Sequence, residues 1–312
     1  KMKKRISIIA FLLVGILTVF SFQGVEAVDY PVTIVDDLGT EVELEEKPER
    51  IISLAPSMTE MLYSLGLGDK VIGVTSFANY PEEAKQNEKI GSVTDPNVEK
   101  IVSLNPDLVL AAAVNKMEYV DRLKNLGIKV AGFDPNSIDE TIEIMNKVGK
   151  LTGEEYLAKE VTAKMARELE EIEKLVEKKL ANNERPGVFY EIWHNPLMTA
   201  GEGTFIDDLI ETAGGKNIGA MAPGSWPQFS LEKLLIENPD IYISSHHSDA
   251  HTFTVEGLKQ RPNYNAINAV KNDRVHFIAQ DIMTRPSPRI ILGLKDLVKA
   301  IWPDLTEDIK GI

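Results

Sequence analysis

Cysteine is absent from the 312-residue sequence. This absence excludes disulfide bonds, thiolate metal sites, iron–sulfur clusters and a cysteine nucleophile, and the chain lacks the cysteine that lipoproteins need for acylation. Several enzyme motifs are missing as well: the Gly-x-Ser-x-Gly elbow, a phosphate-binding glycine loop and a dinucleotide fingerprint. We therefore expect a protein that is not an enzyme. The less favoured alternative is a catalytic dyad built from residues distant in the sequence.

Long apolar runs are also missing, with one exception from Ile6 to Phe22, which follows a basic tip at residues 1–5. With Val25 and Ala27 after it, this run is typical of a secretory signal peptide, and we predict cleavage after Ala27. The alternative is an uncleaved membrane anchor, for which the run is barely long enough. We expect an exported, soluble protein that diffuses freely in a diderm periplasm, unless a lipid-bearing cysteine has been lost from this chain.

Basic residues are in the minority. Residues 1–27 hold four of the 34 basic and one of the 48 acidic residues, so the remaining chain carries a net charge of −17. Such a surface repels nucleic acid and anionic lipid, which excludes both as partners. A hydrophobic content of 43% with regular periodicity indicates an ordered globular protein.

One segment occurs twice, at an offset of 133 residues. Residues 98–110, VEKIVSLNPDLVL, correspond to residues 231–243, LEKLLIENPDIYI. Each copy reads as a short amphipathic helix, a turn containing Asn-Pro-Asp and a buried strand. A self-similar unit at this spacing predicts two lobes of one architecture, and the cleft between such lobes is a place where small molecules bind.

Strands alternate with helices in both halves of the chain, which predicts an α/β fold: two similar lobes, each with a parallel sheet covered by helices on both faces. A β-hairpin is expected at 32–44. The sequence from Ser57 to Glu60 reads as a capping box that opens a helix, and Ser287-Pro288 as the start of the final helix. The expected domains are a signal peptide (1–27), an N-terminal lobe (28–152), a connecting helix (153–184) and a C-terminal lobe (185–312).

Neither glycine nor proline occurs between Glu154 and Ala181. Apolar residues three or four apart form one stripe along this segment, which predicts a helix of about seven turns. Because the helix lies between the two copies of the repeat, we interpret it as the rigid connector of the lobes rather than as a helix of one lobe. The stripe consists of Leu157, Val161, Met165, Leu169, Ile172, Val176 and Leu180.

Ligands of parallel α/β sheets bind outside the carboxyl ends of the strands. The loops expected there are 55–57, 75–80, 93–96, 112–116 and 134–136 in the first lobe, and 193–203, 223–229, 244–252 and 280–287 in the second. Aromatic walls with a few polar groups suit a large, flat, partly apolar ligand. The side chains that these loops contribute are Phe77, Tyr80, Trp193, His194, Trp226, His246, His247, His251, Asp281 and Arg285.

The sequence supports a ligand-binding role for some of these residues more strongly than for others. No periodic pattern would bury Trp226, so a ligand role is preferred for it, whereas Trp193 reads equally well as a core residue. Tyr80 could simply pack the start of a helix, and Asp281 with Arg285 could form a surface ion pair of small energy. Residues 244–251, SSHHSDAH, resemble a metal-binding loop in composition, but one loop seldom supplies three or four converging zinc ligands. We therefore prefer a polar cleft margin to a metal site.

Glu99 and Glu232 occupy equivalent places in the two copies of the repeat, at the second position of a helix whose N-caps are Asn97 and Ser230. Each carboxylate stabilises its helix N-terminus by about 0.3–1 kcal/mol. Helix stabilisation does not explain why the same acid occurs at the same place in both lobes. Docking onto a two-fold symmetric partner is the second hypothesis.

The segments RIISLAPSMTEMLYSLGLGDKVIGVTSFANYP, the two NPD units, NPLMTAGEGTFIDDLIETAGG, SWPQFSLEKLL and RPSPRIILGLKDL together resemble ABC-transporter substrate-binding proteins. The subgroup is the one that binds cobalamin, iron-siderophores and haem, and the cobalamin (vitamin B12) branch is the most similar. The resemblance covers nearly all of 28–312. It implies two lobes joined by one long helix and a monomer whose transported ligand is a corrinoid, with no separate cofactor and no metal site.

By position, the resemblance implies that Trp226, Asp281 and Arg285 line a corrinoid cleft. Phe77 stands where the cobalamin branch has a tyrosine, and Met198 stands at the position of a phenylalanine.

Val93 falls where a tryptophan is expected. Because these ring-stacking positions differ, a ferric siderophore or haem is the alternative ligand. The resemblance also implies that Glu99 and Glu232 contact arginines of the membrane permease, in agreement with the repeat.

Overall fold

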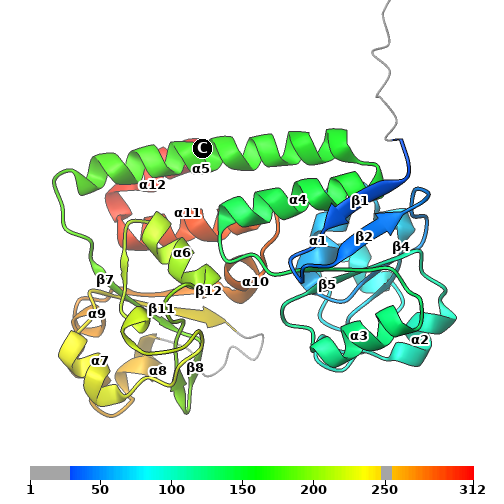
Figure 1. Ribbon diagram of the computed structural model, residues 1–312. Helices are drawn as coiled ribbons and strands as arrows, with labels where there is room; N and C mark the ends of the chain where they lie inside the picture. The colour runs from blue at the N-terminus through cyan, green and yellow to red at the C-terminus, as the bar shows by residue number, and fades with distance from the viewer. Residues whose placement is uncertain (1–28, 247–254) are drawn as a thin grey trace, which may run out of the picture.

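The computed structural model describes residues 29–246 and 255–312. Two α/β lobes stand side by side, and the long helix α5 (Glu155–Leu180) runs along one side of both (Figure 1). The predicted fold class is confirmed. No helix in these residues is both long and apolar enough to cross a membrane.

The N-terminal lobe contains four parallel strands: β3 (Ile51–Ser53), β4 (Val71–Val74), β5 (Leu108–Ala112) and β6 (Val130–Phe133). In space they lie in the order β4-β3-β5-β6. The predicted hairpin forms from β1 (Val32–Val35) and β2 (Glu41–Leu44), which pair antiparallel. The helices are α1 (Pro56–Ser64), α2 (Val98–Ser103), α3 (Met117–Asn125) and α4 (Ile138–Thr152), with 3-10 turns at η1 (Gly68–Lys70) and η2 (Glu82–Gln86).

The C-terminal lobe repeats this plan with β7 (Gly187–Glu191), β10 (Lys216–Asn217), β11 (Ile241–His246) and β12 (Val275–Ala279). These parallel strands lie in the order β10-β7-β11-β12, and β8 (Trp193–His194) pairs with β9 (Leu197–Met198) in a separate hairpin. The helices are α6 (Phe205–Thr212), α7 (Leu231–Glu237), α8 (Val255–Lys259), α9 (Asn268–Lys271), α10 (Gln280–Thr284), α11 (Ile290–Ile301) and α12 (Thr306–Gly311), with 3-10 turns at η3 (Gly219–Met221), η4 (Tyr264–Ala266) and η5 (Pro303–Leu305).

The repeated segment folds in the same way in both lobes. Asn105 and Asn238 each take a left-handed φ of 45°, a conformation that asparagine tolerates better than most residues. Asp107 and Asp240, two residues after these asparagines, make equivalent hydrogen bonds in the two lobes. Asp107 accepts a hydrogen bond from the backbone N–H of Arg50 just before β3, and Asp240 accepts one from Gly187 at the start of β7. The repeat therefore anchors the beginning of the neighbouring strand in each lobe.

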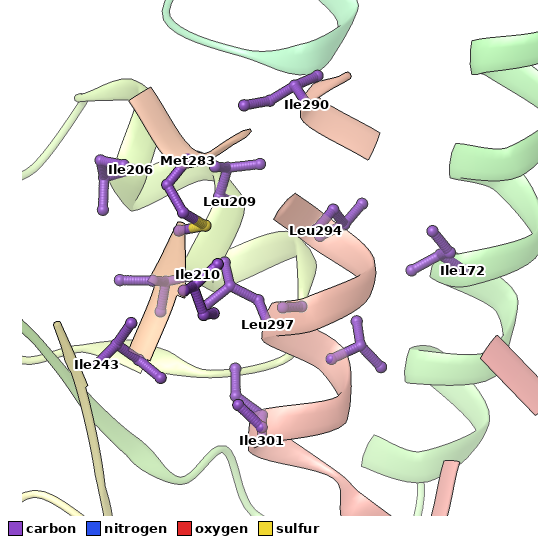
Figure 2. Packing of buried hydrophobic residues seen from close by; sticks show 14 of the residues in the cluster. Ile172, Ile206, Leu209, Ile210, Ile243, Met283, Ile290, Leu294, Leu297 and Ile301 are labelled. Carbon is purple, nitrogen blue, oxygen red and sulfur yellow. The ribbon is translucent and has the colours of Figure 1, made fainter. Parts of the chain in front are cut away.

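The apolar stripe of α5 is divided between the two cores. Leu157 packs against the core of the N-terminal lobe, and Met165 and Val176 belong to the core of the C-terminal lobe. The interpretation of this helix as the connector is thereby confirmed. In the second core, α11 lies between α5 and α6 (Figure 2). The side chains seen there include Ile172 of α5, Ile206, Leu209 and Ile210 of α6, and Leu294, Leu297 and Ile301 of α11.

Two predicted helix starts are wrong. Helix α1 begins at Pro56 with Ala55 as N-cap and no side-chain cap, because proline already has the φ of a first helical residue. Ser57 is therefore inside the first turn. Helix α11 begins at Ile290, and Ser287 does not cap it. Both motifs instead contribute to a polar cluster between the lobes.

Candidate functional site

A cavity of about 810 Å³ lies between the two lobes. Its volume is within the range of small-molecule sites, roughly 300–1,000 Å³. The walls come from loops that follow β3, β4 and β5 in one lobe and from β12 and α10 in the other. The carboxyl ends of the strands therefore meet at this cavity, as the sequence predicts. Ser57, Phe77, Val93, Val114, Asp281 and Arg285 are among the lining residues.

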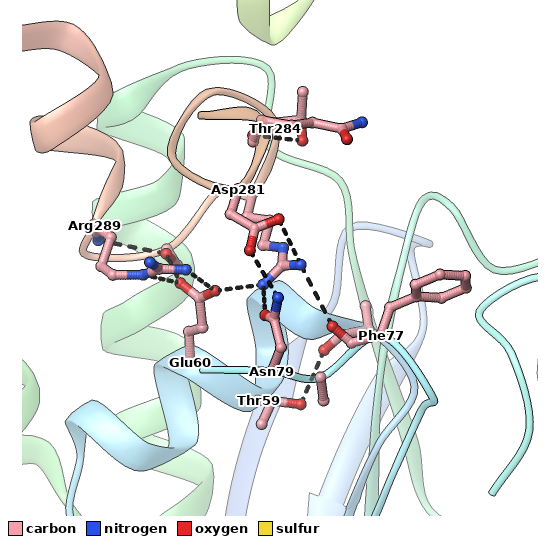
Figure 3. Close-up of polar contacts among 12 residues, drawn as sticks. Thr59, Glu60, Phe77, Asn79, Asp281, Thr284 and Arg289 are labelled. Atoms are coloured by element: carbon pink, nitrogen blue, oxygen red, sulfur yellow. Dashed lines mark hydrogen bonds and ion pairs between the residues drawn. The ribbon is translucent and has the colours of Figure 1, made fainter. Parts of the chain in front are cut away.

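The polar wall of the cavity is a ring of three side chains from both lobes (Figure 3). Arg285 Nη2 lies 2.7 Å from Asp281 Oδ1, and Arg285 Nη1 donates to Asn79 Oδ1 at 2.6 Å. Asn79 Nδ2 closes the ring by donating to Asp281 Oδ2 at 3.0 Å. The side chains of Asp281 and Arg285 form the ion pair that the sequence suggests, but they form it at the cavity rather than on an open surface.

Behind this ring lies Glu60 of α1, which is 3% exposed. Its carboxylate accepts hydrogen bonds from Arg285 Nη1 at 3.0 Å, Arg289 Nε at 2.9 Å and Ser287 Oγ at 2.6 Å. A buried carboxylate needs such partners, because an unpaired charge away from water is very costly. Burial lowers the pKa of Arg289, but the hydrogen bond and charge of Glu60 outweigh burial, so this pKa is raised.

Tyr80 lies beside Arg289, one of the partners of Glu60. The guanidinium carbon of Arg289 is 3.7 Å from the centroid of the Tyr80 ring, which is a close cation–π contact. One face of the ring is thus covered by the protein itself, although the residue is 45% exposed.

Trp193, Met198 and Trp226 lie in neighbouring backbone segments of the C-terminal lobe. Trp193 pairs with Met198 across β8 and β9, and Met198 forms a bridge with Gln228 of the segment that carries Trp226. Trp193 is 44% exposed and Trp226 is 55% exposed, so the interpretation of Trp193 as a core residue is wrong.

These three residues are not part of the polar wall. The described lining residues of the cavity include Phe77, Asp281 and Arg285, but not Tyr80, Trp193, His194, Met198 or Trp226.

The candidate histidines can be followed only in part, because some of them lie outside the described residues. His194 is an exposed residue of β8, and His246 is the last residue of β11. His247 and His251 lie outside the described residues. Within 29–246 and 255–312, no group of three or more histidine, aspartate or glutamate side chains is arranged to hold a metal ion.

Glu99 and Glu232 occupy matching positions in the structure as well. Each is the second residue of its helix, α2 or α7, and each is exposed. The N-caps are the predicted ones: Asn97 accepts a hydrogen bond from the Lys100 N–H, and Ser230 accepts one from the Lys233 N–H. In Figure 1 both helices lie on the side of the molecule away from α5.

A second contact between the lobes involves Asp208 of α6. Its carboxylate accepts a hydrogen bond from the backbone N–H of Ile138, at the start of α4, at 3.3 Å. The pKa of Asp208 is raised to about 6, mainly by burial; the hydrogen bond from Ile138 lowers this pKa, and the charges of the neighbouring carboxylates Asp139, Glu140 and Asp207 raise it. An unfolded aspartate titrates near 3.9. The folded protein therefore holds a proton here between about pH 4 and 6, and this group makes stability fall as the pH rises through that window.

We expect Asp208→Asn to stabilise the protein at pH 7 and above by about 1 kcal/mol, after a discount for partial exposure. The amide keeps an acceptor for Ile138 but carries no charge. At pH 4 the difference from wild type should vanish. Melting curves from pH 4 to 8 test this, with Asp121→Asn on the exposed face of α3 as the control. A stability difference that does not change with pH would contradict the assignment.

Sequence reasoning missed Glu60, Asn79 and Arg289. Glu60 has the sequence context of a capping box. That local pattern explains a glutamate at this position without its partner Arg285, which is 225 residues away. Asn79 lies in a predicted cleft loop between Phe77 and Tyr80, but asparagine is common in loops, so its presence there gave no signal of a contact with the other lobe. Arg289 follows Ser287-Pro288, where a helix start was expected.

Residues 51–282 match the family described as periplasmic binding protein. The ABC transporter substrate-binding lipoprotein YvrC of Bacillus subtilis, itself uncharacterized, is 36% identical over 280 residues, which are 88% of this chain and 87% of the relative. A cobalamin-binding protein of Halobacterium salinarum is 33% identical over 280 residues, 88% of this chain and 75% of the relative.

Solved structures share the fold. A possible iron-binding periplasmic protein of Staphylococcus epidermidis has a TM-score of 0.69 and 34% identity, covering 82% of this chain and all of that one. The vitamin B12-binding protein of Vibrio cholerae has a TM-score of 0.73 and 27% identity, covering 81% and 96%. A haem-binding protein of a Roseiflexus species has a TM-score of 0.74 and 26% identity, covering 82% and 98%.

Proposed function

We propose that this chain, which belongs to the periplasmic binding protein family, has a corrinoid as its ligand. It is a substrate-binding protein of the ABC-importer type that includes cobalamin, haem and siderophore binders. The corrinoid is captured in the cavity between the lobes and delivered to a membrane permease. The relatives are transport proteins rather than enzymes, and we propose the same for this chain.

The observation that carries the corrinoid proposal is the charge-balanced pair of Asp281 and Arg285 in a cavity that apolar side chains, among them Phe77, also line. A corrinoid is a large flat ring bordered by amide groups. The Asp281 carboxylate can accept from an amide N–H, and the Arg285 guanidinium can donate to an amide carbonyl. Haem carries free carboxylates that need unpaired cations, whereas Arg285 and Arg289 are already paired with Asp281 and Glu60.

Phe77 is the proposed apolar contact within the cavity. It lines the cavity, and the residue is 60% exposed. The other proposed ligand contacts come from Tyr80, which follows β4, and from Trp193, His194 and Met198 in the β8–β9 hairpin. Trp226, in the segment beside that hairpin, and His246, the last residue of β11, complete them. The exposed rings of Trp193 and Trp226 would supply large contact areas at small entropic cost.

The remaining assignments are proposals of the same kind. Glu99 and Glu232 dock the permease, one on each lobe, and the protein acts as a monomer. It is exported to the periplasm, with residues 1–27 as signal peptide, 28–152 and 185–312 as the lobes, and 153–184 as the connector. The name of the Bacillus relative describes a lipoprotein, so a lipid anchor is the alternative mode of retention.

Titration of the purified protein with cyanocobalamin, cobinamide, haem and ferric siderophores tests the ligand. We expect one corrinoid to bind per chain, with an absorbance change, heat in calorimetry and a raised melting temperature. Tight binding of haem or a ferric siderophore, without heat from either corrinoid, would replace the corrinoid by that ligand. Zinc or manganese that survives dialysis and is lost in variants of His246, His247 and His251 would instead indicate a metal receptor.

A further inference from the structure

The side-chain partners of Glu60 all lie in the opposite lobe. The residue is on α1 of the N-terminal lobe, whereas Arg285, Ser287 and Arg289 lie between α10 and α11 of the C-terminal lobe. Figure 3 shows the carboxylate between the two guanidinium groups. The lobes are therefore joined at the cavity as well as through α5.

We infer that Glu60 is a positioning residue that fixes the width of the cleft and the orientation of Arg285 before any ligand binds. For its effect on ligand affinity this inference rests on the proposed function. Its effect on the separation of the lobes does not.

The hydrogen bonds of Glu60 connect the two lobes at short distances. The hydrogen bonds from Arg285, Arg289 and Ser287 to the Glu60 carboxylate are between 2.6 and 3.0 Å long. Such contacts are lost when donor and acceptor move apart by much more than about 0.5 Å beyond these distances. The lobes cannot separate at this point without breaking several charge-assisted hydrogen bonds together, so the carboxylate holds the cleft at one width.

Arg285 has hydrogen-bond acceptors on more than one side. Its Nη1 is shared by Glu60 and Asn79, and its Nη2 faces Asp281 and the carbonyl oxygen of Phe77. Acceptors on different sides leave the planar guanidinium little freedom to rotate. A group held in its bound orientation loses less entropy when a ligand arrives, which raises affinity. Glu60 thus acts on the ligand through Arg285, since Glu60 itself does not line the cavity.

The absence of cysteine makes a direct test simple, because two introduced cysteines can be spin-labelled selectively. Exposed positions on α3 and α8, Asn125→Cys and Glu256→Cys, report the distance between the lobes in ligand-free protein. In this background we expect a narrow distance distribution. Glu60→Gln should broaden it and shift it to longer distances, because the amide removes the charge that holds both arginines. In the unlabelled protein the same change should weaken cyanocobalamin binding about fivefold.

Glu191→Gln is the matched control. Glu191 is equally buried and is paired with an arginine, Arg261, but both residues belong to the C-terminal lobe. Neutralising it should lower stability without changing the distance between the lobes. If Glu60→Gln destabilises the fold too far, Ser287→Ala removes one hydrogen bond to the same carboxylate and should give a smaller shift in the same direction.

A folded Glu60→Gln protein with the parent distance distribution overturns the inference, and so does a change equal to that of Glu191→Gln. If cyanocobalamin fails to bind the wild-type protein, the proposed function fails, but the distance measurement still decides the role of Glu60. If the distance shifts while affinity stays unchanged, the link from Glu60 through Arg285 to the ligand is wrong.

Discussion

Reversing the charge on both lobes, with Glu99→Lys and Glu232→Lys in one protein, is expected to reduce ligand uptake more than tenfold while ligand affinity stays nearly unchanged. The two residues are exposed, one on each lobe, at matching positions of α2 and α7. If a permease presents arginines to both, two attractive contacts become repulsive, and like charges facing each other at an interface cost several kcal/mol. A loss of about 1.4 kcal/mol already corresponds to tenfold.

The measurement is transport into proteoliposomes that contain the permease, at low and at high salt, beside calorimetric titration of the ligand. The defect should be largest at low ionic strength, where exposed charges act over the longest range. Glu118→Lys with Glu256→Lys is the matched control, since both are exposed glutamates at the second position of a helix, one in each lobe. Both pairs weaken helix N-termini by a similar amount, about 0.3–1 kcal/mol per residue. Equal transport by the two double variants would leave only helix stabilisation as the role of Glu99 and Glu232.

Most of the fold could be predicted from the sequence because its signals are local. The stripe from Leu157 to Leu180 and the absence of glycine and proline define α5 without knowledge of its partners. The repeated Asn-Pro-Asp turn likewise predicts two equivalent lobes. The division of the stripe between two cores agrees with its position between the repeats.

The candidate site was predictable only in part, because several of its contacts join residues that are far apart in the sequence. Arg285 and Asp281 follow a recognisable strand, so the rule for carboxyl ends places them at the cavity. The contacts of Glu60 join residues 225 to 229 positions apart, and nothing in the local sequence distinguishes its buried carboxylate from a helix cap. Arg289 was missed because its partners, Glu60 and Tyr80, lie in the other lobe.

Trp226→Ala is expected to weaken corrinoid binding about thirtyfold, which corresponds to about 2 kcal/mol, the loss typical of a buried aromatic contact at a binding hot spot. In ligand-free protein the residue is 55% exposed and lies in a segment beside the hairpin of Trp193 and Met198. Truncation should therefore change the free energy of unfolding by less than about 0.5 kcal/mol. Calorimetric titration with cyanocobalamin, together with melting curves, measures both quantities.

Tyr80→Ala should weaken binding less, because one face of the Tyr80 ring is already covered by the guanidinium of Arg289 at 3.7 Å and is not available to a ligand. The comparison separates the two aromatic positions by what each ring touches in the free protein. Losing Tyr80 removes a cation–π contact within the protein, whereas losing Trp226 removes a ring that is 55% exposed and lies outside the core. Unchanged affinity in a folded Trp226→Ala protein would remove this residue from the site and would assign ring stacking to Phe77, which lines the cavity directly.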